Sequence, residues 1–137
     1  MGDRRFVAGV GCTSAAGADE IVALVEACLA EVGADRNALA CLATTLRRRG
    51  HAELREAAER LEVPLRCLDH EALAAQQGRL AAPSSRVAEY AGLEGIAEAA
   101  ALAAGELVLG KRVKGGVTCA LTHVGPGFDA ERFGVPA

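Results

Sequence analysis

The stretch Gly95–Lys111 constrains the fold of this chain more than any other part of the sequence. Four apolar residues recur in it at helical spacing: Ile96, Ala99, Ala100 and Ala103. Gly105 ends this helical pattern, and a continuous apolar run follows. Because small side chains allow packed elements to come close together, an alanine-covered helix can lie near a sheet. The stretch therefore predicts a helix packed on a sheet, followed by a strand of that sheet.

Strand-like and helical segments alternate ahead of this stretch. Three strands are predicted, over residues 5–11, 38–43 and 65–68. The second is a near-continuous apolar run, which is typical of a parallel strand buried on both faces. Four helices are predicted from apolar stripes, acids in the first turn and capping residues. Two cover residues 18–32 and 53–61. A third begins at His70 after the capping residue Asp69, and a short fourth covers residues 86–90 and is capped by Ser84 or Ser85.

The C-terminal third adds two strands. The run after Gly105 is one of them, Lys114-Gly115-Gly116 predicts a hairpin, and residues 117–123 return antiparallel. This order predicts an α/β fold, a three-layer sandwich with a mostly parallel sheet and a C-terminal antiparallel hairpin. We expect residues 1–124 to form one domain and residues 125–137 to form a loosely ordered tail.

Composition excludes several classes of function. A net charge of −3, one tyrosine and no tryptophan disfavour a nucleic-acid surface or an anionic-membrane surface. The five cysteines show no CxxC spacing, and there is no signal-peptide or membrane-spanning pattern, so we expect buried thiols and a cytoplasmic protein.

Polar and glycine-rich segments follow the three predicted parallel strands. They are residues 11–17, 44–51 and 69–70. Ligands of open α/β sheets bind at this carboxyl edge. In the first segment, glycines and helix amides suit an anionic group, and Thr13 and Ser14 add hydroxyls. A tight turn with a helix cap explains the same residues without a ligand.

Familiar cofactor and metal motifs are not met. Ser14 stands where the third glycine of a dinucleotide fingerprint belongs, and no phosphate-binding P-loop is present. The histidines are too scattered for a metal site, so no metal and no cofactor is predicted. Cys12 at a helix N-terminus would have a lowered pKa, but a nucleophile also needs a nearby base, and a buried packing thiol is the alternative.

Several segments together resemble one known family. They are GVGC at 9–12 before a DEI-type helix, LAT at 42–44, PL at 64–65, and PSSRVAEYAGLEGIAEAAALAAG at 83–105 with Lys111 after it. This pattern resembles the family of the cobalamin-biosynthesis protein CobE and the C-terminal domain of CbiG. The resemblance covers residues 6–123, and its most specific part is Gly92–Leu102.

The resemblance implies a role in building the corrin ring of vitamin B12. CbiG is a cobalt-precorrin-5A hydrolase in which other domains precede this one. Because this chain starts at the first strand, we expect the stand-alone, CobE-like form. Two segments depart from the family pattern: Thr13–Gly17 lacks the usual basic residues, and residues 46–51 replace an acidic/Lys arrangement, which leaves Glu53 as its equivalent.

Three functions remain open at this point. The leading hypothesis is an accessory or carrier protein that binds a corrinoid or precorrin intermediate, a large apolar ring fringed with carboxylates. The first alternative is a hydrolase of a precorrin lactone or acyl bond, with Glu98 or His51 as the base. The second alternative is an interaction module that docks on other cobalamin-pathway enzymes.

The hypothesis names specific residues. Cations for the carboxylates would come from Arg47–Arg49 and Lys111. The predicted ligand-binding residues are Gly11, Cys12, Thr13, Ser14, Thr44, Thr45, Ser84, Ser85, Glu98 and Lys111. A monomer is expected, or a homodimer if the alanine-rich helix faces a second copy.

Overall fold

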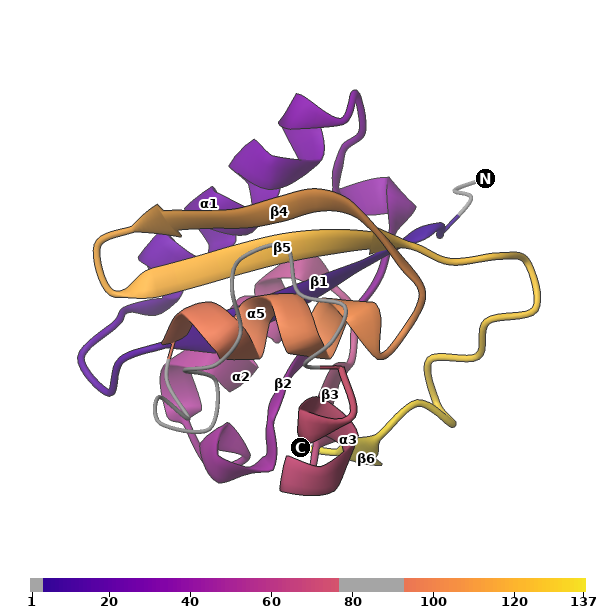
Figure 1. Cartoon of the computed structure of the whole chain (residues 1–137). Helices are drawn as coiled ribbons and strands as arrows, with labels where there is room; N and C mark the ends of the chain where they lie inside the picture. The colour runs from indigo at the N-terminus through magenta and orange to yellow at the C-terminus, as the bar shows by residue number, and fades with distance from the viewer. Residues whose placement is uncertain (1–3, 77–92) are drawn as a thin grey trace.

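The polypeptide folds around a six-stranded sheet with helices on both faces (Figure 1). The computed structural model describes residues 4–76 and 93–137. The strand order is β4-β5-β1-β2-β3-β6. The strands are β1 (Phe6–Cys12), β2 (Leu39–Thr45), β3 (Leu65–Leu68), β4 (Glu106–Lys114), β5 (Val117–His123) and β6 (Val135–Pro136).

The parallel core and the C-terminal hairpin confirm the predicted α/β class. β1, β2 and β3 pair in parallel, whereas β5 pairs antiparallel with both β1 and β4. β4 therefore runs in the same direction as β1–β3, and four of the six strands share one direction. Every residue of β2 is buried, which explains its continuous apolar run.

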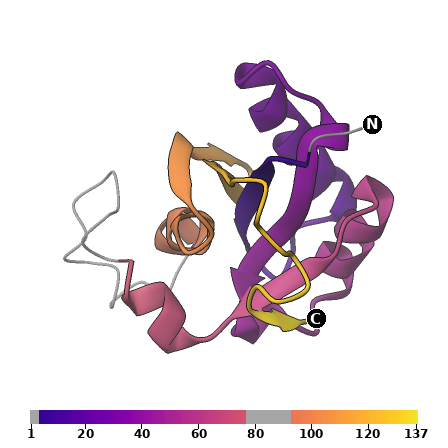
Figure 2. The ribbon, with the colours of Figure 1, turned by 90° about the vertical axis from the view of Figure 1, so that its right-hand side faces the viewer.

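Helices cover both faces of the sheet and form the predicted three-layer sandwich (Figure 2). They are α1 (Ala18–Glu31), α2 (Ala52–Leu61), α3 (His70–Ala74) and α5 (Leu93–Leu102), with short 3-10 turns η1 (Arg36–Ala38) and η2 (Leu46–Arg48). α1 and α2 pack together on one face, and α5, with α3 beside it, covers the other. Among the described residues, no helix has the length and apolar character needed to cross a membrane.

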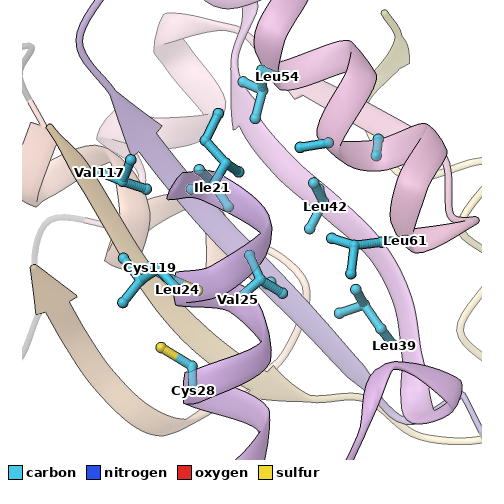
Figure 3. Close-up of a cluster of buried hydrophobic side chains, with 14 of the residues drawn as sticks. Ile21, Leu24, Val25, Cys28, Leu39, Leu42, Leu54, Leu61, Val117 and Cys119 are labelled. Atoms are coloured by element: carbon cyan, nitrogen blue, oxygen red, sulfur yellow. The ribbon is translucent and has the colours of Figure 1, made fainter. Parts of the chain in front are cut away.

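The larger core lies between the sheet and the helices α1 and α2 (Figure 3). The predicted stripe of α1 is buried there: Ile21, Leu24, Val25, Cys28 and Leu29. Leu54 and Leu61 of α2 close the cluster over β2. All five cysteines are free and buried, as predicted, and Cys28 of α1 and Cys119 of β5 both lie inside this cluster.

On the other face, α5 lies unusually close to β1. An ideal Cβ built on Gly9 would lie 2.0 Å from the carbonyl oxygen of Ala97 and 2.7 Å from the amide nitrogen of Ala101. Ala97 and Ala101 are themselves fully buried against the sheet. The contact therefore requires glycine on the strand and alanine on the helix, as the small residues of α5 predicted.

The C-terminal tail is held more firmly than the expected loose surface segment. β6 pairs antiparallel with β3, and the amide of Ala137 donates to the carbonyl oxygen of Leu65 (3.2 Å). Arg66 is only 7% exposed as a residue, and its guanidinium donates to three tail carbonyls. The acceptors are the carbonyl oxygens of Glu131, Phe133 and Gly134. A buried cation needs such partners, so β3 fixes the tail through its own charged residue.

The segment after β3 was predicted only in part. Asp69 caps α3 as expected, because its Oδ1 accepts a hydrogen bond from the amide of Ala72 (2.8 Å). The predicted helix over 86–90 and its capping residues Ser84 and Ser85 lie outside the described residues.

Candidate ligand-binding site

The parallel strands end at one edge of the sheet, where three connections meet (Figure 1). We call these connections the rim: residues 13–17 after β1, residues 46–51 after β2, and residues 115–116 in the β4–β5 hairpin. The amide of Thr13 donates to the carbonyl oxygen of Gly116 (2.9 Å), and Nε2 of His51 donates to the carbonyl oxygen of Thr13 (3.2 Å). The rim is thus one hydrogen-bonded unit.

The amides after β1 do not form the open anion cradle that the sequence suggested. Three of them donate within the chain: Thr13 to Gly116, Ala16 to the carbonyl oxygen of Thr13 (3.2 Å), and Gly17 to Oε1 of Glu20 (3.0 Å). The carboxylate of Glu20 therefore lies at the α1 N-terminus, where an anionic ligand would have to bind. This loop is a turn with a helix cap, and only Ser14 in it is an exposed predicted residue.

Several other predicted residues lie inside the sheet. Thr44 and Thr45 belong to β2 instead of to the loop after it. The Thr44 hydroxyl is fully buried and donates to the carbonyl oxygen of Val10 (2.7 Å), while the Thr45 hydroxyl accepts from the amide of Arg47 (3.3 Å). Gly11 is buried in β1, where its carbonyl oxygen accepts from the Thr118 hydroxyl (3.4 Å). These hydrogen bonds stabilise the strand ends from which the rim begins.

Cys12 lacks the properties of an activated nucleophile. Its side chain is 1% exposed. Burial raises the pKa of the Cys12 thiol, and the nearby charge of Arg48 only partly opposes this. The expected lowering by the helix N-terminus is outweighed because burial destabilises the thiolate. Cys12 is a packing residue of the core.

Glu98 and Lys111 lie together, and a hydrogen bond joins the carboxylate of Glu98 to the backbone of Lys111. Oε2 of Glu98 accepts from the backbone amide of Lys111 (2.9 Å) at an irregularity of β4 between Leu109 and Arg112. The guanidinium of Arg112 donates to the carbonyl oxygens of Gly110 (3.1 Å) and Lys111 (3.3 Å) at the same point. Glu98 is 4% exposed, and this contact gives it a structural role on the outer strand of the sheet.

His51 is the N-cap of α2. Its Nδ1 accepts from the amide of Leu54 (3.3 Å), and its Nε2 donates to Thr13. Both ring nitrogens therefore have partners, which fixes the tautomer with the proton on Nε2. A general base needs a nitrogen lone pair that faces a substrate, and this arrangement does not supply one.

Four arginines gather where β2 leads into α2. They are Arg47, Arg48, Arg49 and Arg55. Among the described residues, no guanidinium in this group makes a hydrogen bond or an ion pair, whereas the remaining described arginines all have partners. We call this group the arginine cluster.

The arginine cluster extends from the end of β1 to β3. Burial raises the pKa of the Cys67 thiol in β3, and the charges of Arg49 and Arg55 are close enough to oppose that shift. Arg48 acts in the same way on Cys12. The sequence pointed to three of the four arginines but not to Arg55. Its position four residues after His51, one helical turn along α2, was the available signal.

No metal centre is apparent in the part of the chain that the structure describes. Residues 4–76 and 93–137 contain no group of three or more His, Cys, Asp or Glu side chains placed to hold an ion.

Comparisons with known proteins identify the family. The family described as "Cobalamin synthesis G C-terminus" matches residues 6–122. The chain belongs to this family. It is 37% identical over 97 residues to Protein CobE of Sinorhizobium sp, an alignment that covers 71% of this chain and 63% of that protein. The chain thus spans less than two thirds of the length of this curated relative.

Solved structures of the family share the fold. A CobE crystal structure superimposes with a TM-score of 0.79 at 33% identity, covering 88% of this chain and 90% of the other. The cobalamin biosynthesis protein chiG from Agrobacterium tumefaciens gives 0.66 at 32% identity, with 88% and 98% coverage. These homologues indicate a cobalamin-biosynthesis protein of the CobE/CbiG type. A putative cobalamin biosynthesis protein G homolog from Sulfolobus solfataricus, 22% identical, shares the fold with a TM-score of 0.69 over 88% of this chain and 37% of that one.

Proposed function

We propose that this protein binds a corrinoid or precorrin intermediate of cobalamin biosynthesis as an accessory or carrier protein, with the arginine cluster as its carboxylate-binding surface. The observation that carries the proposal is the set of four guanidiniums without partners in the described chain, at the carboxyl edge of the sheet. Family membership indicates the pathway, and the arginine cluster provides side chains that can bind carboxylates.

The charge of the cluster suits a polycarboxylate. The whole chain carries a net charge of −3, yet four positive charges lie together without a neutralising partner among the described residues. A planar guanidinium can bind a carboxylate through two parallel hydrogen bonds, which lysine cannot do. A ligand with carboxylates around its periphery could engage several of these arginines at once.

An exposed apolar side chain lies beside these charges. Leu46, which opens η2 directly before Arg47, is 37% exposed and is one of few large apolar side chains at the described surface. A macrocycle with an apolar face and charged margins could pack on Leu46 while its carboxylates reach the arginines. Both ring nitrogens of His51 have partners, and Glu98 is only 4% exposed with its Oε2 on the backbone amide of Lys111, which favours binding over hydrolysis.

The test is a binding experiment with hydrogenobyrinic acid, a cobalt-free corrin acid. The purified protein and the pigment are passed together through gel filtration, and the corrin absorbance in the protein peak is titrated to give a dissociation constant. We expect retention of spectrally unchanged pigment and weaker binding at high salt, because salt screens exposed charges. Absence of retention overturns the carrier role, and a changed pigment spectrum points to the hydrolase instead.

A triple substitution tests whether the arginine cluster is the surface that binds the corrin. The change Arg47→Gln, Arg48→Gln and Arg49→Gln should raise the dissociation constant roughly 10- to 100-fold, since each exposed ionic contact contributes about 1 kcal/mol or less. Arg132→Gln is the matched control, because Arg132 is an exposed arginine of the tail that pairs with Asp129. Equal affinities of the triple variant and the control would remove the arginine cluster from the site.

A further inference from the structure

His51 connects the arginine cluster to the rest of the rim. We infer that it is a positioning residue, which holds the η2 segment and its arginines in the arrangement that binds carboxylates. This inference rests on the proposed function, and it assigns His51 a role different from the base that the sequence suggested.

The segment from Thr45 to His51 is fixed at both ends. At its start, the Thr45 hydroxyl accepts from the amide of Arg47 (3.3 Å). At its end, the amide of His51 donates to the carbonyl oxygen of Arg48 (2.9 Å), and the His51 ring caps α2 through Leu54. Three arginines of the cluster lie between these two attachment points. A short segment held in this way loses less conformational entropy when its side chains bind a ligand.

The imidazole also joins this segment to a different loop. Its Nε2 donates to the carbonyl oxygen of Thr13, and the amide of Thr13 donates to Gly116 in the β4–β5 hairpin. The chain of hydrogen bonds therefore runs from the η2 segment through the loop after β1 to the hairpin. Without the imidazole, Thr13 and Gly116 would remain joined, but η2 would lose its attachment to both.

The two ring nitrogens have separable tasks. An asparagine at position 51 can still cap α2, because an N-cap side-chain oxygen accepts from the N3 amide, here that of Leu54. The shorter side chain cannot also reach Thr13. His51→Asn therefore removes the connection between loops and keeps the cap, whereas His51→Ala removes both.

The experiment compares His51→Asn, His51→Ala and the control His123→Asn, whose histidine ends β5 at the opposite edge of the sheet. Urea unfolding measures the loss of the cap, the hydrogenobyrinic acid titration measures affinity, and hydrogen exchange measures the order of residues 46–51. For His51→Asn we expect a urea midpoint close to that of the wild-type protein. The dissociation constant should rise about 3- to 10-fold, with faster exchange of residues 46–51 alone.

The outcomes separate this inference from the proposed function. If wild-type protein binds the corrin and His51→Asn binds it equally well, the positioning role is wrong while the binding function stands. Unchanged exchange of residues 46–51 in His51→Asn overturns the positioning role without reference to any ligand. Absence of binding by the wild-type protein overturns the proposed function and this inference with it. Losses of stability and affinity that are confined to His51→Ala would reduce His51 to a helix cap.

Discussion

The close approach of α5 to β1 makes Gly9 the most sensitive position of the fold. In Gly9→Ala, the added methyl group would lie 2.0 Å from the Ala97 carbonyl oxygen, 2.7 Å from the Ala101 amide nitrogen and 3.1 Å from the Ala101 Cβ. Two of these atoms belong to the helix backbone, so no side-chain rotation relieves the clash. Non-bonded heavy atoms prefer roughly 3.5–4.0 Å, so α5 would have to move outward by more than about 1 Å.

Such a movement would weaken the whole packing of α5. The helix rests on β1, β2, β4 and β5 through alanines, which have no long side chains to fill a widened gap. Overpacking usually costs about 1–3 kcal/mol, and we expect Gly9→Ala to lower the free energy of unfolding by about 3 kcal/mol or more. In a domain of this size that corresponds to a fall of roughly 10 °C in the melting temperature.

Urea unfolding followed by circular dichroism measures the effect, with Gly50→Ala as the matched control. A Cβ at Gly50 would meet no atom within 4 Å, and a surface substitution of this kind changes stability by about 0.5 kcal/mol or less. Unfolding of Gly9→Ala at the same urea concentration as the control would contradict the predicted clash, because the helix would then have room for the methyl group.

Two further predictions concern buried polar groups. Arg66→Ala should lower the free energy of unfolding by roughly 2–4 kcal/mol and expose the C-terminal tail to proteolysis, because three tail carbonyls lose their charged donor. Arg66→Lys should recover only part of this stability. Equal protease resistance of the wild-type protein and the two variants would contradict the prediction. Burial raises the pKa of Cys41 from 9.0 to about 12, so the unfolded chain releases this proton at lower pH than the folded protein does. Stability should be fully present below pH 9 and fall between pH 9 and 12, with a shallower fall in Cys41→Ala; identical slopes in the two proteins would contradict this assignment.

Local patterns were sufficient for the individual elements. The stripe of α1 repeats at helical spacing, and the Lys114-Gly115-Gly116 turn fixes where the hairpin reverses, so both follow from neighbouring residues. The alanine-rich helix even predicted its own close packing. In contrast, the two-residue strand β6 carries no pattern of its own and forms because β3 offers it an edge and Arg66.

The candidate site could be predicted less well from the sequence. Thr44 and Glu98 are polar residues in an apolar context, which suggests function, but the structure shows each hydrogen-bonded to backbone groups of a distant strand. The arginine run was visible in the sequence, whereas the absence of acidic partners among the described residues was not, because ion pairs such as Arg112–Glu31 join residues far apart in the chain.

The sequence by itself determined the order of the elements from β1 to α3 and from α5 to β5, the α/β class and, through the resemblance confirmed by the family match, the cobalamin pathway. Those properties depend on periodicity and on motifs, which are local. Only the tertiary structure decided which polar groups satisfy one another and which remain available to a ligand. That distinction depends on contacts between distant segments, as when His51 reaches Thr13 while the arginines beside it are left without partners in the described chain.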